Sequence, residues 1–453
     1  MFESRIAQLA VVALLFLGRT AFAQDYVLSP IGVAKIDITP TEPIRLSGYG
    51  FRREPHEGVI HPIWAKALAI GSDDIGPAVL LMVDGTCIPE SVTNEVARRL
   101  AERTKVVPDK FALSYTHTHT APMVRGGLDT LFGEAVPADH QAAIDRYTAT
   151  LIDKLEHVSL AALEDRQPCH LSWAVGNVDF AANRRTPGGP VDHSLPVMFV
   201  HNANGELRAI VANYACHCTT LDNNLISGDW AGYAQIHIER AHPGAISMIT
   251  IGCGADSNPD PRRTLELAEQ HGRSLAAEVE RVRQVEQKPI PGIVTAKRER
   301  IQLAFDTLPT REEWEARARQ QDAVGYHARV QLARLDAGPL PTELGYTIQT
   351  WTFGDDLAMV FLPGEVVVDY ELRLKREFDP QRIWVNAYSN DAPCYIPSRR
   401  IWEEGGYEGA SAMTYYDRPT RLTADTEERI FAAIHRLLPD EFRATPAAIE
   451  DAK

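Results

Sequence analysis

Residues 78–122 read AVLLMVDGTCIPESVTNEVARRLAERTKVVPDKFALSYTHTHTAP. They begin with an apolar run at 78–83, continue with helical spacing of apolar residues over 90–104, and return to an apolar run that leads into His117 and His119. A strand, a helix and a second strand in this order predict a layered α/β fold with right-handed crossovers. Side chains two apart on a strand share one face, so both histidines are expected on one side of the second strand's end. Such a pair is compatible with a transition-metal or acid–base site.

The same alternation of elements continues through the chain, and no linker, repeat or shift in composition divides it. The predicted fold class is α/β, with a large mixed β-sheet core flanked by helices in a single-domain layered architecture. Residues 24–440 are expected to form this domain, and residues 441–453 a flexible tail. Strands are expected at about residues 31–40, 65–70, 171–178, 197–201, 208–215, 245–252, 293–303, 346–353, 357–362 and 384–389, and helices at about 139–163, 229–241, 262–287, 310–336 and 424–438.

Size and charge limit the classes of partner. The chain has 453 residues, of which 45% are hydrophobic and 24% charged, as in an ordinary globular protein. Its formal net charge of −15 argues against nucleic acid, and against anionic membrane surfaces, as electrostatic partners. The sequence leaves the oligomeric state open.

The first residues have the pattern of a secretory signal peptide. Arg5 gives a positive start, residues 9–17 form an apolar core, and Ala-Phe-Ala at 21–23 is a small-x-small cleavage site. We expect a signal peptide at residues 1–23, cleaved between Ala23 and Gln24, and hence a secreted or periplasmic protein. Later apolar segments are shorter than the roughly 20 residues that a spanning helix needs, so no transmembrane anchor is expected after cleavage.

The cysteines do not form the pattern of a disulfide scaffold. There are six of them, widely scattered, and export would permit disulfides without requiring them. Cys216 and Cys218 flank His217, so they are either thiolate metal ligands or small residues on a buried strand.

Polar side chains follow the ends of several predicted strands. In a layered α/β fold, ligands bind in the crevice at the carboxyl ends of the strands, and catalytic zinc takes nitrogen and oxygen ligands while keeping one position for water. A zinc site is therefore expected among these residues: His117 and His119, His217, Asp256 with Asn258, Glu365, and Asn390 and Asp391 with Tyr395.

Six groups of motifs occur in order between about residues 30 and 415. They are GVAKIDITP at 32–40 with SGYG at 47–50, THTHTAP at 116–122, CHCTT at 216–220, SGDWAGYA at 227–234, PGE at 363–365 and GYEGAS at 406–411. Taken together they resemble the neutral/alkaline (non-lysosomal) ceramidase family, whose members are zinc amidases that cut the N-acyl bond of ceramide. The family carries a C-terminal immunoglobulin-like domain after its zinc domain, and none is expected in this chain.

The resemblance implies one Zn²⁺ per chain. Carried over by position, it makes His117, His217 and Glu365 zinc ligands, and Tyr395 is the position that matches the family's fourth ligand, a tyrosine. Asp391 lies close enough in sequence to compete with Tyr395 for the metal, so the fourth ligand stays open.

The resemblance also implies catalytic roles for three further residues. His119 would sit beside the metal as a proton donor or acceptor, or would hydrogen-bond a ligand there. Arg184 and Tyr407 would contact the substrate or its oxyanion. A serine once suggested as nucleophile in the family aligns with Ser257 or with Asn258, depending on the anchor, which leaves serine chemistry unsupported.

The sequence thus predicts a secreted zinc-dependent hydrolase of the neutral ceramidase type, which cleaves an N-acyl amide bond of a small-molecule or lipid substrate with zinc-activated water. Two alternatives remain. One is a zinc-dependent esterase, lactonase or carbohydrate-processing hydrolase on the same scaffold. The other is a non-catalytic protein with a structural metal, which four protein ligands would enclose.

Overall fold

A computed structural model describes residues 27–444 of the chain. The expected signal peptide at residues 1–23 lies outside this range, as does most of the expected tail. Within the described range, the Phe442 side chain is buried and Arg443 forms a β-bridge with Phe378. None of the helices in the described range is both long enough and apolar enough to cross a membrane.

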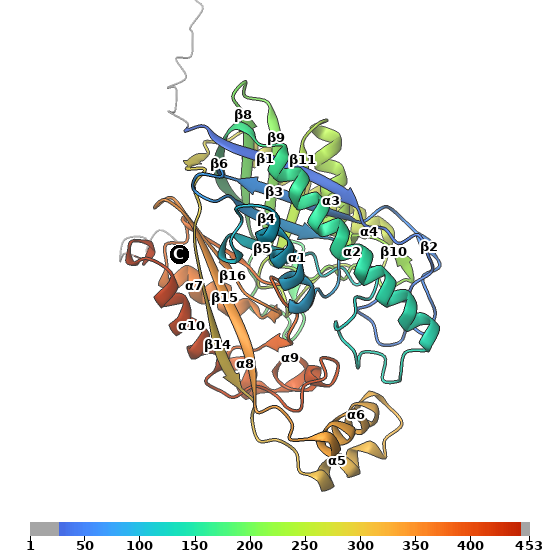
Figure 1. The fold of residues 1–453 in the computed structure, drawn as a ribbon. Helices are drawn as coiled ribbons and strands as arrows, with labels where there is room; N and C mark the ends of the chain where they lie inside the picture. Colours follow the sequence, from blue (N-terminus) through green and yellow to red (C-terminus); the bar gives the residue numbers. More distant parts are fainter. Residues whose placement is uncertain (1–26, 445–453) are drawn as a thin grey trace, which may run out of the picture.

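A nine-stranded mixed sheet forms the centre of the molecule (Figure 1). Most neighbouring strands in it are antiparallel, and the pairs β4/β5 and β9/β11 are parallel. Its strand order is β11 (Ile246–Ile251), β9 (Leu207–Tyr214), β8 (Ser194–Asn202), β6 (Gln167–Asn177), β1 (Ser29–Asp37), β3 (Trp64–Ile70), β4 (Ala78–Val83) and β5 (Phe111–Tyr115), with β13 (Lys288–Ile290) added to β6.

A second, four-stranded sheet packs against one face of the first. Its order is β14 (Thr295–Ala304), β15 (Glu343–Phe353), β16 (Leu357–Phe361) and β18 (Ile383–Asn386). Alternate side chains of the large sheet meet large aromatic side chains of the smaller sheet in one buried cluster, which includes Trp173, Trp351 and Trp384. Because strands such as β4 are covered on both faces, their sequences are continuously apolar, and this explains why they were recognisable.

Helices cover the outer faces of both sheets. On the large sheet, α2 (Ala138–Glu164) contacts β1 and β3, α3 (Asp229–Ala241) contacts β11, and α4 (Leu265–Arg283) contacts β6 and β8. On the small sheet, α10 (Thr426–Leu437) contacts β14 and β15. The predicted α/β fold with a large mixed sheet flanked by helices is confirmed.

The remaining elements, apart from α5 and α6, are four helices, three 3₁₀ turns and three two-stranded pairs within the described residues. They are α1 (Glu90–Arg103), α7 (Val368–Glu377), α8 (Arg399–Glu404), α9 (Gly406–Gly409), the 3₁₀ turns Pro108–Lys110, Ser411–Thr414 and Asp440–Phe442, and three two-stranded pairs: β2 (Gly58–Val59) with β10 (Leu225–Ile226), β7 (Ala181–Asn183) with β12 (Ser257–Pro259), and β17 (Glu365–Val366) with β19 (Tyr395–Ile396).

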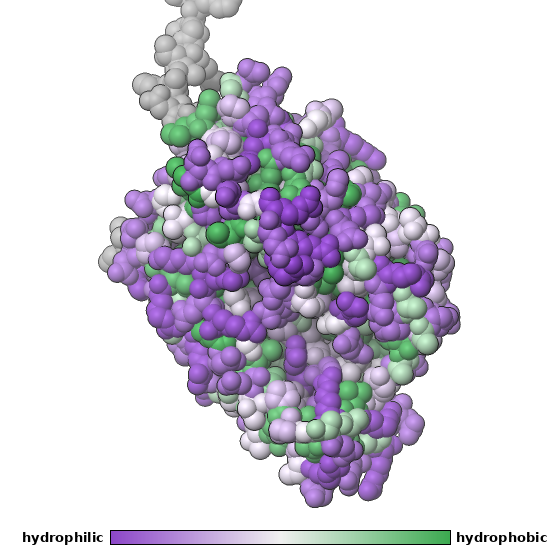
Figure 2. All heavy atoms as spheres, in the orientation of Figure 1, coloured by the Kyte–Doolittle hydropathy of each residue, from purple (hydrophilic) through white to green (hydrophobic). Residues whose placement is uncertain are grey.

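The single helix expected at 310–336 is instead two helices, so that prediction was wrong in one respect. The chain forms α5 (Arg311–Ala318) and α6 (Ala323–Ala337), which lie apart from the sheets in Figure 1. The break follows from capping: the Asp322 side chain accepts the backbone N–H of Gly325 at 3.0 Å and so begins a new helix. The face of the molecule seen in Figure 2 is mostly hydrophilic, with small, separate hydrophobic areas.

Residues 387–390, which follow β18, bridge the two edge strands of the large sheet. The Ala387 N–H donates to the carbonyl of Ile251 in β11 (2.9 Å), and the Asn390 N–H donates to the carbonyl of Leu113 in β5 (2.7 Å). The Asn390 side chain continues this pairing, because its Oδ1 accepts the Leu113 N–H at 2.9 Å and its Nδ2 donates to Gln349 at 2.7 Å. This bridge brings the residues after β5 next to those after β9 and β11.

Replacement of Asn390 should therefore weaken the fold at this bridge. Asn390→Ala removes two side-chain hydrogen bonds at a position with φ of 64°, a conformation that asparagine tolerates better than alanine. We expect the free energy of unfolding to fall by about 1–3 kcal/mol, measured by urea denaturation. The control is Asn94→Ala, an exposed site on α1; equal loss in both variants would contradict the role assigned to Asn390.

Candidate metal and catalytic site

His117 lies just after the end of β5, and its side chain is held in one orientation. Its backbone is left-handed, with φ of 54°, and its Nδ1 lies 2.5 Å from the carbonyl oxygen of Thr86. A carbonyl can only accept a hydrogen bond, so this contact requires the proton on Nδ1. Nε2 of His117, which lies 3.1 Å from Nε2 of His119, thereby keeps a lone pair that can bind a metal.

His217 is held in the same way from the other side. It follows β9, is fully buried, and places Nδ1 2.8 Å from the carbonyl oxygen of Gly254. The Tyr388 hydroxyl lies 3.4 Å from the same nitrogen, and the Tyr388 ring stacks on His117 at 4.7 Å between centroids. Burial, and secondarily the positive charge of Arg184, lower the pKa of His217 to about 4, which keeps its imidazole neutral.

Glu365 faces both imidazoles. Its Oε2 lies 3.2 Å from Nε2 of His117 and 3.0 Å from Nε2 of His217. The other oxygen, Oε1, accepts a short hydrogen bond from the Tyr416 hydroxyl. Burial alone would raise the pKa of Glu365, but the two adjacent imidazoles hold that pKa well below its ordinary value. The carboxylate is therefore ionised and oriented.

These three side chains fit a divalent metal ion. Tetrahedral bonds of about 2.0–2.1 Å place neighbouring ligand atoms about 3.3 Å apart, close to the separations between Oε2 and the two Nε2 atoms. Within the described residues, His217 Nε2 and Glu365 Oε2 are buried without a hydrogen-bond partner, so their contact does not have hydrogen-bond geometry. Two imidazoles and one carboxylate are a donor set that zinc accepts.

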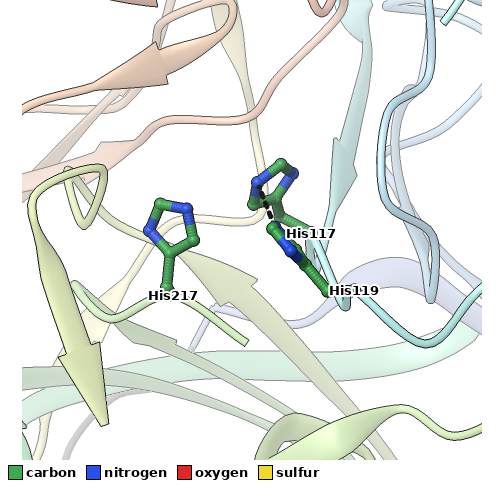
Figure 3. A group of neighbouring side chains, drawn as sticks. All are labelled: His117, His119 and His217. Carbon is green, nitrogen blue, oxygen red and sulfur yellow. Dashed lines mark hydrogen bonds between the residues drawn. The ribbon is translucent and has the colours of Figure 1, made fainter. Parts of the chain in front are cut away.

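His119 completes a cluster of three histidines (Figure 3). The ligand atoms of His117, His119 and His217 all lie within 4.8 Å of one another, and Nε2 of His119 is 3.1 Å from Nε2 of His117. Burial, followed by repulsion from the other two histidines, lowers the pKa of His119 well below its ordinary value. The position of His119 suits either a further ligand of a bound metal ion or a proton carrier beside such an ion.

Tyr395, Arg184 and Tyr407 are brought together on one side of this cluster. Tyr395 pairs with Glu365 in the short parallel ladder of β17 and β19, and its hydroxyl accepts a hydrogen bond from Arg184 Nη2 at 3.0 Å. Arg184 also donates to Glu408 at 2.8 Å. Tyr407 is the accessible member, with 42% of its surface exposed. An oxyanion or substrate approaching the cluster could meet the tyrosine and arginine groups together.

Other residues considered from the sequence are engaged elsewhere. Asp391 Oδ1 accepts hydrogen bonds from the backbone N–H groups of Glu90 (2.7 Å) and Ala392 (2.8 Å), and through Glu90 it caps the start of α1. Asp256 Oδ1 accepts the N–H of Val368, and its Oδ2 the Asn183 amide. The six cysteines are all buried and free, and burial raises the pKa of Cys216 and Cys218 well above the ordinary thiol value.

Four residues that matter here had no sequence pattern to reveal them. They are Thr86 and Gly254, which act through backbone carbonyls, and Tyr388 and Tyr416, which contact His217 and Glu365. A carbonyl acceptor is present at every position, so only the fold can identify the two that matter. The tyrosines lie outside the motifs quoted above, so only spatial proximity selects them.

Known proteins match part of the chain in sequence. The family described as "Neutral/alkaline non-lysosomal ceramidase, N-terminal" matches residues 30–252. Among curated proteins, "Neutral ceramidase A" of Dictyostelium discoideum is 25% identical over 240 residues, which are 48% of this chain and 33% of that protein. "Neutral ceramidase" of Pseudomonas aeruginosa is 26% identical over 228 residues, 46% of this chain and 33% of that protein. The matched segment thus spans about a third of these relatives.

Solved structures extend the similarity of fold to nearly the whole chain. The structure of neutral ceramidase from Pseudomonas aeruginosa superposes with a TM-score of 0.70 over 93% of this chain and 77% of that one, at 18% identity. A structure titled "Ceramidase complexed with C2" gives a TM-score of 0.70 over 92% and 78% of the two chains, also at 18% identity. Residues 30–252 thus resemble the N-terminal part of the neutral/alkaline ceramidase family, and the fold of nearly the whole chain resembles that of neutral ceramidases.

Proposed function

We propose that the protein is a zinc-dependent hydrolase that cleaves an N-acyl amide bond, with one Zn²⁺ per chain. The observation that carries the proposal is that three ligand atoms converge on one buried point: His117 Nε2, His217 Nε2 and Glu365 Oε2. Both histidines donate a hydrogen bond from Nδ1 to a backbone carbonyl, which turns Nε2 toward that point. A zinc ion held there would activate water and polarise a carbonyl oxygen. The similarity of residues 30–252 to the neutral/alkaline ceramidases supports the choice of an amide.

The chain's own residues supply the remaining chemistry in this proposal. His119 Nε2 moves a proton between the attacking water and the leaving amine, for which its neutral state at pH 7 is suited. Tyr407 and Arg184 orient the acyl oxygen and stabilise its developing charge. Tyr395 is the candidate for a fourth protein ligand, in which case the zinc would need a fifth position for water. The hydrogen bond between Tyr395 and Arg184 would link the metal site to the substrate site. Tyr416 fixes Glu365.

We place the protein outside the cytoplasm, secreted or periplasmic, because residues 1–23 have the pattern of a signal peptide. The substrate would be a small-molecule or lipid N-acyl compound. An ester or lactone is the nearest alternative substrate on the same site, and a matched pair of an acyl amide and the corresponding acyl ester would separate these activities.

One observation favours a second candidate, a structural metal. Nε2 of His119 lies as close to Nε2 of His117 as two ligand atoms of one metal ion lie to each other. Four protein groups could therefore close the coordination shell: His117, His119, His217 and Glu365. A closed shell leaves no position for water and hence no hydrolysis.

Removal of His117 tests the metal site. His117→Ala should lose stoichiometric zinc, because one of three converging donors is gone, and the turnover of an N-acyl amide should fall by about three orders of magnitude or more. Zinc is measured by inductively coupled plasma mass spectrometry, and turnover by amine release. The control is His157→Ala, an exposed histidine on α2. Full zinc and full turnover in His117→Ala would end the proposal.

Replacement of His119 separates the catalytic reading from the structural one. As a proton carrier, His119→Gln should keep zinc near one per chain while kcat falls about 100-fold or more. As the fourth structural ligand, the same variant should lose zinc affinity. The measurement is a zinc titration against a competing chelator alongside kcat, and zinc loss without prior activity in the parent protein would favour the structural metal.

A further inference from the structure

Arg262 is a half-buried cation without a partner. Within residues 27–444, no hydrogen bond or ion pair joins its guanidinium to another group. The adjacent Arg263, by contrast, is ion-paired with Asp222. Arginine side chains that are partly removed from water normally find carboxylate or carbonyl partners, because an unpaired charge is costly to bury. An arginine without a partner at the rim of the candidate site is therefore a candidate for binding a ligand.

The loop that carries Arg262 lies between two loops of the candidate site. On one side, the Arg263 N–H donates to the Thr220 carbonyl at 2.7 Å, three residues after His217. On the other side, β12, which precedes the loop, pairs with β7, and the Arg184 N–H donates to the Asp256 carbonyl at 2.8 Å. Arg262 thus stands on the rim between His217 and Arg184.

The charges around this rim do not balance. Arg184 shares the Glu408 carboxylate with Arg185, and Arg263 is paired with Asp222. Arg52 is buried and bonded only to backbone carbonyls, those of Ser47, His119 and Asn223. Burial lowers the pKa of Arg52 to about 10, which leaves it charged at neutral pH. Besides these pairs, the exposed Asp260 is the nearest acidic residue in sequence, two positions before Arg262.

We propose that Arg262 binds an anionic group of the substrate, so that the preferred substrates are N-acyl compounds with a carboxylate close to the scissile amide, as in N-acyl amino acids. The inference deepens the proposed amide hydrolysis and rests on it for the reaction. A guanidinium offers two parallel N–H donors to a carboxylate, which fixes direction as well as charge. The fixed charge of Arg52 behind the His119 loop adds to the attraction.

Two compounds that differ only in charge test this assignment: N-octanoylglycine and N-octanoylglycinamide. With the zinc-loaded full chain, kcat/KM for the carboxylate should exceed that for the carboxamide by about 10–100-fold, the usual range for a hydrogen bond to a charged group. In Arg262→Gln the ratio should approach one. An N-acyl ethanolamine and its phosphate ester form a second pair, which shows whether a phosphate replaces the carboxylate.

The matched control is Arg273→Gln, an arginine on the exposed side of α4 that is paired with Glu269. It should leave the ratio at the parent value. A parent protein without preference for the anion, or an Arg262→Gln protein that keeps the preference, would overturn the inference.

The role of Arg262 in binding an anion can be tested even if the proposed amide hydrolysis does not occur. If no amide is hydrolysed, isothermal titration with the same pair of compounds still decides the role of Arg262. We then expect the parent protein to bind the carboxylate about tenfold or more tightly than the carboxamide, and Arg262→Gln to bind both alike. Equal affinities in the parent protein would contradict the assignment.

Discussion

Two hydrogen bonds from histidine Nδ1 atoms to backbone carbonyls are the constraint on which the candidate site depends. The carbonyls of Thr86 and Gly254 fix the tautomers and ring planes of His117 and His217. Both Nε2 atoms must then face inward, where they meet the carboxylate of Glu365. Rotation of either ring would break a buried hydrogen bond, which costs about 1–3 kcal/mol when the group is left unpaired. The donor set is therefore preorganised before any ligand arrives.

The fold supplies this arrangement by joining the two edges of its large sheet. Residues 387–390 bond to β5 on one side and to β11 on the other, so the loops after β5, β9 and β16 meet at one place. His117, His217 and Glu365 are buried there, and burial explains why His119 and His217 stay neutral. A buried site with unpaired nitrogen and oxygen atoms is expensive unless something binds to those atoms, and a divalent cation meets that need.

Much of this could be predicted from the sequence, and the limits have physical causes. Continuous apolar runs and helical spacing indicated the strands and most helices, because each depends on local periodicity. The motifs identified His117, His217 and Glu365, which the fold brings together. The break at Asp322 was missed because its only signal is a single capping residue, whereas helical periodicity is read over many residues. Asp391 stayed ambiguous because its engagement with the start of α1 joins segments about 300 residues apart. The contacts of Tyr416 and Tyr388 are equally non-local.

The central claim is that one metal ion is held jointly by His117, His217 and Glu365. The most direct test is a crystal structure of the zinc-loaded protein with diffraction data collected on both sides of the zinc absorption edge. We expect a single strong anomalous peak about 2.0–2.2 Å from Nε2 of His117, Nε2 of His217 and a carboxylate oxygen of Glu365. A zinc ion bound with full occupancy elsewhere, with these three side chains in mutual contact and no anomalous density between them, would contradict the claim.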